Sequence, residues 1–492
     1  MLGKVKHKGL ALAVLAAAQF IVVLDATIVN VALPAIQKAL GFTTDAQLQW
    51  VVTAYALTFG GFLLLGGRLA DMFGRRKMLV AGIVIFAIAS LLAGIAQDPT
   101  QMIITRGLQG VGGALLAPAG LSLILTIFKE GAERNKAFGV FSMVAAGGGA
   151  VGLVLGGLLT QYVDWRWIFF INVPLSALII AAAFKYIPAS EPVERQRIDY
   201  VGALTITGSL MALVYALAKA AEDGWGAGIT ITMFILAAAL MAVFILNELW
   251  IKRPLIKLSI FKRRNVTGGN IIQLLMPAAM FGMFFYLSIY LQTILQYSPV
   301  KTGLANLPFT LTVIVVAGYL SRNIAKFNPK VILSVAPLMV AGALLWFARI
   351  PVDGQYLTDV LPGIVIMAAG MAMVFVTTTM VTTSGVSHED SGLVSGLLNT
   401  GQQVGGAIGL AVLTVVSSAV IKSDMIAAQG NQAALPAAMV HGFQHGFIAA
   451  AIFAAAASVA AITILKVHKP TKKDLANISE TEAEAMPAIP GV

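Results

Sequence analysis

The sequence predicts an all-α membrane protein with 14 transmembrane helices, in which two linking helices join two six-helix pseudo-symmetric halves. Hydrophobic side chains make up 58% of the 492 residues and charged side chains only 11%, whereas a soluble domain has about 25% charged residues. The apolar residues also form blocks of about 18 to 25, and an α-helix needs about 20 residues to cross a bilayer. Finally, the basic residues are distributed unevenly between alternate loops.

Taken in order, the apolar blocks predict spans at residues 9–33, 48–67, 78–96, 101–125, 138–160, 167–187, 200–219, 229–250, 268–292, 303–321, 331–348, 360–383, 401–421 and 445–466. With the N-terminus inside, the cytoplasmic segments contain 26 of the 33 Lys and Arg, and the outer loops contain six. The remaining one, Arg106, lies within the fourth span. This split follows the positive-inside rule and predicts that both termini are cytoplasmic.

Two glycine-rich segments indicate an internal duplication. "GVFSMVAAGGGAVGL" at 139–153 and "GLLNTGQQVGGAIGL" at 396–410 share several glycines at an offset of 257. Chance similarity is the alternative, but membrane proteins often contain repeated halves. A duplication predicts an N-terminal six-helix half at 1–187, a linker with two extra transmembrane helices at 188–265 and a C-terminal six-helix half at 266–467. The residues at 468–492 are polar and predict a disordered cytoplasmic tail.

Asp25 lies in the middle of the first apolar block, where a charge costs about 3 kcal/mol or more. Because of this cost, Asp25 is a candidate functional residue. A helical wheel places it on a stripe of small residues, and other polar residues occupy different faces, so span 1 should contact protein or a cavity. At 1.5 Å per residue, Asp25 lies about 14 Å and Arg106 about 9 Å below the outer surface, so the two can pair. The alternative is a fixed Asp–Arg pair that only joins spans 1 and 4.

The segment "GRLADMFGRRK" at 67–77 lies at the cytoplasmic end of the second span. Its spacing resembles the G-x-L-A-D-x-x-G-R-R motif of the major facilitator superfamily. In that family this loop locks the two halves together on the cytoplasmic side. The resemblance therefore implies a conformational gate made by Gly67, Asp71, Gly74, Arg75 and Arg76. An ordinary basic loop is the alternative.

Two further segments resemble motifs of the drug:proton antiporters in this superfamily: "LDATIVNVALP" (24–34), which looks like the first-span motif of the fourteen-span antiporters, and "GVFSMVAAGGGAVGLVLGGLL" (139–159), which looks like the antiporter motif of span 5. A third, "ITRGLQGVGGA" (104–114), resembles the R-x-x-Q-G-x-G motif of the superfamily as a whole. The resemblance implies a proton-coupling and substrate site that contains Asp25, Arg106, Asn30 and Gln109. It also implies an antiporter motif in the fifth span, made by Gly139, Gly148, Gly152, Gly156 and Gly157.

One position departs from the family pattern. Leu153 stands where the antiporter motif has a proline. Leucine keeps the backbone donor and removes the obligatory kink, while the neighbouring glycines still permit close helix packing. The departure bears on the direction of transport and on tightness against proton leak, because the family's proline shapes span 5.

The resemblance implies a secondary active transporter that exports hydrophobic, cationic or zwitterionic drugs or toxic compounds in exchange for protons, by alternating access. The alternative is a dedicated proton-coupled exporter of one metabolite, peptide, antibiotic or lipid. The expected partners are the small-molecule substrate, the proton and the lipid bilayer, with no nucleic acid, cofactor or metal, and we expect a monomer in the cell membrane.

Other function classes find little support in the sequence. It contains no G-x-x-x-x-G-K-[ST] segment, which argues against an ATP-driven pump. Five histidines and no cysteine leave little from which to build a catalytic cluster, so no enzyme activity is predicted.

Overall fold

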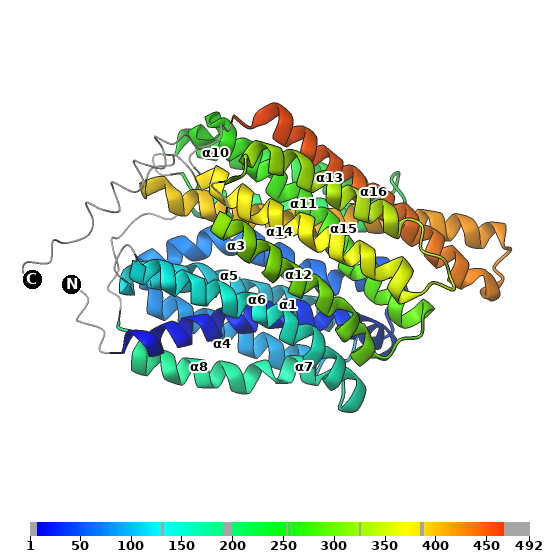
Figure 1. Cartoon of the computed structure of the whole chain (residues 1–492), viewed down its shortest axis with the longest axis horizontal. Helices are drawn as coiled ribbons and strands as arrows, with labels where there is room; N and C mark the ends of the chain where they lie inside the picture. Colours follow the sequence, from blue (N-terminus) through cyan, green and yellow to red (C-terminus); the bar gives the residue numbers. More distant parts are fainter. Residues whose placement is uncertain are drawn as a thin grey trace, which may run out of the picture.

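The computed structural model describes residues 7–128, 132–189, 199–251, 254–256, 258–323, 326–383 and 388–466. Within these ranges the chain is helical and contains no β-strand. Figure 1 shows the long helices lying side by side, roughly along the longest axis of the molecule. The prediction of an all-α fold is therefore confirmed for the described residues. The predicted tail at 468–492 lies outside them.

The helices of the first part of the chain are α1 (Lys8–Leu40), α2 (Asp45–Leu48), α3 (Trp50–Phe73), α4 (Arg75–Gly94), α5 (Pro99–Ile127), α6 (Ala132–Tyr162), α7 (Trp167–Phe170) and α8 (Asn172–Tyr186). Their ends follow from local chemistry. Gly41 ends α1 with a φ of 74°, a left-handed conformation that glycine adopts without strain. The Asp98 side chain accepts a hydrogen bond from the backbone N–H of Gln101, and Pro99 occupies the first turn of α5, so this helix begins with both common start signals.

The linker contains α9 (Tyr200–Asp223), α10 (Gly228–Trp250) and the short helix η1 (Leu258–Lys262). The remaining helices are α11 (Arg264–Ile289), η2 (Tyr290–Ile294), α12 (Pro299–Asn323), α13 (Pro329–Phe347), η4 (Tyr356–Val360), α14 (Leu361–Thr383), α15 (His388–Ala427), η5 (Gln432–Ala434) and α16 (Leu435–Ile464). Figure 1 shows α15 and α16 projecting together beyond the other helices at one end of the molecule.

Twelve helices in the described part of the chain are long and apolar enough to cross a membrane. The chain is therefore a multi-pass membrane protein. Two predicted spans are absent from these twelve: α3 contributes only the shorter apolar stretch Trp50–Leu63, and several side chains of α6 lie outside the described part. The count of 14 spans thus stays a prediction.

The two glycine-rich segments form equivalent contacts in the structure. Gly148 and Gly152 of α6 pack against α1, and Gly405 and Gly409, at the offset of 257, pack against α11. At each of the four positions, a methyl group built on the glycine would come within 3.2 Å of an atom of the neighbouring helix. A duplication explains this correspondence, although the domain boundaries themselves stay a prediction.

The first part of the chain packs against the last through α6 on α12 and α3 on α15, and α1 also contacts α11. The linker helix α9 contacts both α3 and α15, so it covers the seam between them. Thr207 of α9 donates a hydrogen bond through Oγ1 to the carbonyl of Gly61 in α3, at 3.0 Å. Next to it is an apolar cluster shared by the three helices: Ala56, Leu57, Leu210, Val214, Leu217, Val404, Ala407 and Ala411.

Candidate functional site

Asp25 is completely buried in the middle of α1, with a relative exposure of 0%. The stripe of small residues predicted beside it is also buried and consists of Ala11, Ala18 and Ala32. Asp25 therefore contacts protein and not lipid, as the helical wheel predicted. A carboxylate in such a place is stable only if other groups supply hydrogen bonds and an opposite charge.

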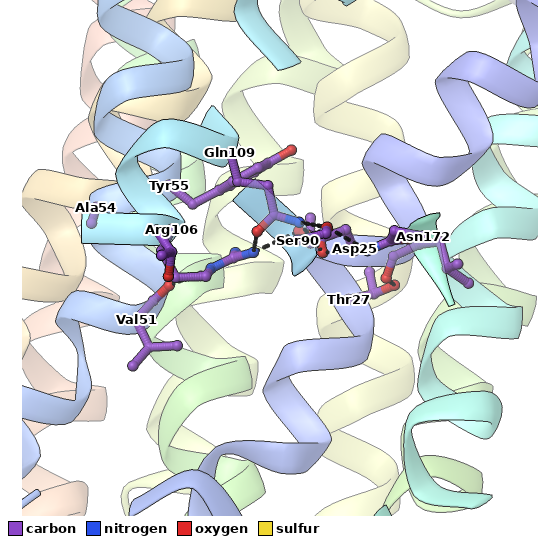
Figure 2. Close-up of polar contacts among 12 residues, drawn as sticks. Asp25, Thr27, Val51, Ala54, Tyr55, Ser90, Arg106, Gln109 and Asn172 are labelled. Carbon is purple, nitrogen blue, oxygen red and sulfur yellow. Dashed lines mark hydrogen bonds and ion pairs between the residues drawn. The ribbon is translucent and has the colours of Figure 1, made fainter. Parts of the chain in front are cut away.

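Figure 2 shows that three side chains from two other helices supply these partners. The Nη1 of Arg106 donates to Oδ2 of Asp25 at 2.6 Å, and the pair forms an ion pair. The other carboxylate oxygen, Oδ1, accepts from Nε2 of Gln109 at 2.6 Å and from Nδ2 of Asn172 at 2.9 Å. Arg106 and Gln109 belong to α5, and Asn172 is the first residue of α8. The predicted pairing of Asp25 with Arg106 is thus direct.

Arg106 is fixed by further contacts and has a relative exposure of only 1%. Its Nε donates to the carbonyl of Val51 in α3 at 2.9 Å, and Nη1 also donates to Oε1 of Gln109 at 2.6 Å. Its Cζ lies 4.5 Å from the centre of the Tyr55 ring, within the range of a cation–π interaction. A planar guanidinium satisfies all these partners at once, which a lysine ammonium cannot do.

Ser90 of α4 closes the network on its other side. Its Oγ accepts from Nε2 of Gln109 at 2.6 Å and from Nδ2 of Asn172 at 3.2 Å. Sequence reasoning did not select Ser90, Asn172 or Tyr55. One sequence feature could have identified Ser90 and Asn172: like Asp25, each is a polar residue within an apolar run. Their side chains join α4 and α8 to the acid on α1.

The charges within this network balance. Every hydrogen bond that Asp25 receives comes from an N–H donor, so the network is complementary to the ionised carboxylate. The guanidinium supplies the matching positive charge. A proton added to Asp25 would cancel the ion pair and oppose one of the three donors, so protonation requires the site to rearrange.

Asn30, a predicted member of the site, lies elsewhere. Its side-chain Nδ2 donates to the carbonyl of Ala26 at 3.1 Å, and its backbone carbonyl accepts from Oγ of Ser288 at 2.6 Å. Because Ser288 belongs to α11, Asn30 lies where the first and last parts of the chain meet. The structure thus brings together Asp25, Arg106 and Gln109 and leaves Asn30 outside their hydrogen-bond network.

The predicted gate segment forms the turn between α3 and α4. Gly74 has a φ of 98°, which permits the tight turn expected there, whereas Gly67 lies within α3. Arg75 donates through Nη1 to the carbonyl of Ser122 at 3.2 Å and to Oγ1 of Thr126, both in α5. Arg76 donates to the carbonyl of Ile187, just after α8, at 3.0 Å. The side chain of Asp71 lies outside the described part of the structure.

Four glycines of the predicted antiporter motif allow close approach of helices. A methyl group on Gly148 would lie 3.2 Å from the carbonyl of Phe20, and on Gly156 it would lie 2.8 Å from that of Ile28. On Gly152, between them, it would overlap Thr27 and lie 2.9 Å from the carbonyl of Leu24. These three glycines therefore bring α6 against the part of α1 that contains Asp25.

The motif also contacts α12. A methyl group on Gly157 would lie 2.6 Å from the carbonyl of Pro299, at the start of that helix, and one on Gly303 would overlap the carbonyl of Leu153. Leu153, at the position of the family's proline, is itself buried, and α6 continues through it from Ala132 to Tyr162. Gly139 also lies in α6, but its surroundings are outside the described part.

The chain matches the family model of the Major Facilitator Superfamily over residues 15–410. The chain belongs to the major facilitator superfamily. Its relatives include the puromycin resistance protein pur8 of Streptomyces alboniger, 41% identical over 448 residues, which are 90% of this chain and 88% of the relative. The cephamycin export protein CmcT of Amycolatopsis lactamdurans is 33% identical over 476 residues, 95% of each chain. The superfamily consists of transporters, in agreement with the expectation that this chain is not an enzyme.

Solved structures of this superfamily share the fold. A bacterial homologue of the human lysosomal transporter Spinster, in an inward-facing and unoccupied conformation, has a TM-score of 0.66 at 16% sequence identity, covering 95% of this chain and 100% of the other. A peptide transporter of the POT family in complex with sulfate has a TM-score of 0.67 at 14% identity, covering 93% and 96%. At these identities the likeness concerns the fold alone.

Proposed function

We propose that this member of the superfamily exports hydrophobic, cationic or zwitterionic compounds in exchange for protons, by alternating access. The observation that carries the proposal is the buried Asp25–Arg106 pair in a chain whose relatives are named for antibiotic resistance and export. The cell membrane, cytoplasmic termini and a monomeric state, all expected from the sequence, are part of the same proposal.

In the proposed cycle, Asp25 is the proton acceptor and Arg106 tunes its affinity. All three groups that donate to Asp25 are N–H donors, which suit an ionised acid, so in this cycle we assign the described conformation to the step after proton release. A proton that enters from the outer side neutralises Asp25 and weakens its bond to Arg106. A cationic substrate is attracted to the same carboxylate, so proton and substrate exclude one another there, which produces exchange.

A dedicated exporter of one compound is the second candidate. The relatives favour it because several are named for a single antibiotic, including puromycin, cephamycin and tetracenomycin C. A susceptibility screen in a host that lacks its own efflux pumps separates the two candidates. Resistance to dyes, quaternary ammonium compounds and unrelated antibiotics supports multidrug export, and resistance to one compound class supports the dedicated exporter.

Proton exchange is tested in everted vesicles that hold an acidic interior. Addition of a lipophilic cationic dye is expected to raise the interior pH as protons leave and the dye enters. Vesicles without the protein provide the control. Dye accumulation without any change of interior pH would contradict proton exchange while leaving transport itself intact.

Arg106→Lys is expected to reduce dye transport about tenfold while the protein still folds. Lysine keeps the positive charge beside Asp25, but it cannot also donate to Val51 and Gln109 or stack on Tyr55 as the guanidinium does. Initial transport rates in liposomes provide the measurement. Arg166→Lys is a suitable control because Arg166 also lies on an aromatic ring, that of Trp165, but is partly exposed. Equal rates for Arg106→Lys and the wild type would show that only the charge matters.

A further inference from the structure

Two buried carboxyl groups lie together in the linker, on helices that are not part of the Asp25 site. Asp199 directly precedes α9, and Glu248 lies in the last turn of α10. Each residue has a relative exposure of 5%. Acids are almost never buried to this degree without a partner of opposite charge. The pair therefore requires an explanation that membrane insertion does not provide.

Asp199 accepts hydrogen bonds through both of its carboxylate oxygens. Its Oδ1 accepts from the backbone N–H of Gly202 at 2.7 Å, which caps α9. Both of its carboxylate oxygens lie 2.8 Å from Nδ2 of Asn247 in α10. The bond from Gly202 is that of an N-cap residue. Asp199 thus fastens the start of α9 to the end of α10.

Glu248 has only half of its hydrogen bonds. Its Oε2 accepts from the backbone N–H of Ile256 at 2.9 Å. Its Oε1 is buried and has no hydrogen-bond donor in the described part of the chain. A buried oxygen without a donor costs about 1–3 kcal/mol, so a donor is missing at this atom.

The oxygen that lacks a donor, Oε1 of Glu248, lies next to Asp199. A methyl group built on Gly202 would overlap Oδ2 of Asp199 and would lie 2.6 Å from Oε1 of Glu248, so the two oxygens flank one point. Two carboxyl groups this close, away from water, cannot both be ionised.

No cation neutralises the pair within the described residues. No ion pair among the described residues involves either carboxyl group, and the side chains of Lys262 and Arg264 are exposed. Lys252, Arg253 and Lys257, which follow Glu248 in the sequence, lie outside the described residues. The guanidinium of Arg264 donates to the carbonyls of Ile464 and Thr463. The tyrosine that follows Asp199, Tyr200, is also exposed. Since none of the described basic residues pairs with Asp199 or Glu248, a shared proton is the positive charge that the described geometry favours.

We propose that Asp199 and Glu248 share one proton and that this proton is a latch, which holds the segment after α10 against the last part of the chain. With the proton in place, Glu248 donates to Asp199 through Oε1 and still accepts from Ile256 through Oε2. Without it, two unpaired anions repel each other in a buried place, and the end of α10 moves away from the start of α9. The contact between Glu248 and Ile256 is then lost.

The latch acts on an apolar cluster that joins the linker to other helices. Ile256 and Leu255 belong to this cluster, together with Ala203 and Phe244 of the linker helices and with Val266, Val394 and Leu397 of α11 and α15. Release of Ile256 opens this cluster. The site is distinct from Asp25, so the inference does not depend on the proposed exchange mechanism.

The test uses a single cysteine at Ile256, introduced into a chain that has none. Ile256→Cys keeps the backbone N–H that bonds to Glu248. The rate of maleimide modification in nanodiscs is measured between about pH 6 and 9 and is divided by the rate in unfolded protein at the same pH, which corrects for thiol ionisation. We expect the normalised rate to rise about tenfold with pH as the shared proton is lost.

Glu248→Gln is the decisive variant, because its amide can donate to Asp199 and accept from Ile256 at every pH. We expect low reactivity that is independent of pH. Asp199→Asn removes the other carboxyl group of the pair and should also abolish the pH dependence. It is the alternative variant if Glu248→Gln does not fold. Asp223→Asn, at the exposed end of α9, should keep the wild-type profile. A flat profile in the wild type, or an unchanged pH dependence in Glu248→Gln, would overturn the proposal.

Discussion

Asp25→Asn is expected to abolish proton-coupled export, with a loss of at least about 100-fold, which corresponds to the cost of leaving one member of a buried ion pair unpartnered. Asparagine cannot release a proton, so it cannot exchange one for a substrate. Its amide also presents a donor to a site whose neighbours are all donors, and it leaves the charge of Arg106 without a partner. The measurement is substrate-induced proton release in everted vesicles.

Asp98→Asn is the matched control for this loss. Asp98 caps α5 in an exposed place, and asparagine caps helices as well as aspartate does, so proton release should be unchanged. Dye binding to purified Asp25→Asn protein shows whether the substrate pocket survives. Proton release at the wild-type rate in Asp25→Asn would mean that another group carries the proton.

The double variant Asp25→Asn with Arg106→Gln separates coupling from a fixed structural pair. It removes both charges together and leaves side chains that can still hydrogen-bond to each other. If Asp25 only joins α1 to α5, this variant should regain coupled transport. If Asp25 carries the proton, it should fold well and bind dye but release no protons.

Gly152→Ala is expected to destabilise the protein and to slow transport, because Gly152 lies where α6 packs against α1 next to Asp25. The added carbon would overlap Thr27 and lie 2.9 Å from the carbonyl of Leu24, which directly precedes Asp25. Because a backbone carbonyl cannot move aside by changing rotamer, α1 and α6 must separate, at a cost of about 1–3 kcal/mol. We expect a lower thermal transition and transport reduced about tenfold, since the same shift displaces Asp25 from Arg106.

Gly147→Ala, on the same helix, provides the comparison. No atom lies within 4 Å of a methyl group at that position, and alanine favours a helix by up to about 1 kcal/mol over glycine. This variant should be as stable as the wild type or more stable. Equal thermal transitions for the two alanine variants would show that the close contact of α6 with α1 is not needed.

The pairing of Asp25 with Arg106 could be predicted from the sequence because depth in a membrane follows from residue number at a fixed rise per residue. The amide and hydroxyl partners could not. Ser90 and Asn172 lie on helices whose rotation about their own axes is set by packing, and a hydrophobic sequence contains little information about it. The helical wheel already places Asn30 on a different face of α1 from Asp25, but it does not show that this face contacts α11.

Helix lengths were underestimated for a related reason. The first span was predicted at 9–33, but α1 continues to Leu40 with Pro34 inside it. The thirteenth was predicted at 401–421, whereas α15 runs from His388 to Ala427. Hydropathy detects the part of a helix that lies in hydrocarbon, and both helices extend beyond that part at their polar ends.

The position of α9 over the seam between α3 and α15 determines how the linker can follow a rocking movement. Its hydrogen bond from Thr207 to Gly61 attaches α9 to α3, whereas its neighbours on α15 are the smooth side chains of Val404, Ala407 and Ala411. The contacts of α9 with α15, here and where Ala203 meets Val394 and Leu397, are apolar and have no fixed direction. We therefore expect α9 to keep its hydrogen bond to α3 and to slide against α15 when the two halves move. The linker helix α9 then provides the apolar surface along which α15 slides in each transport cycle.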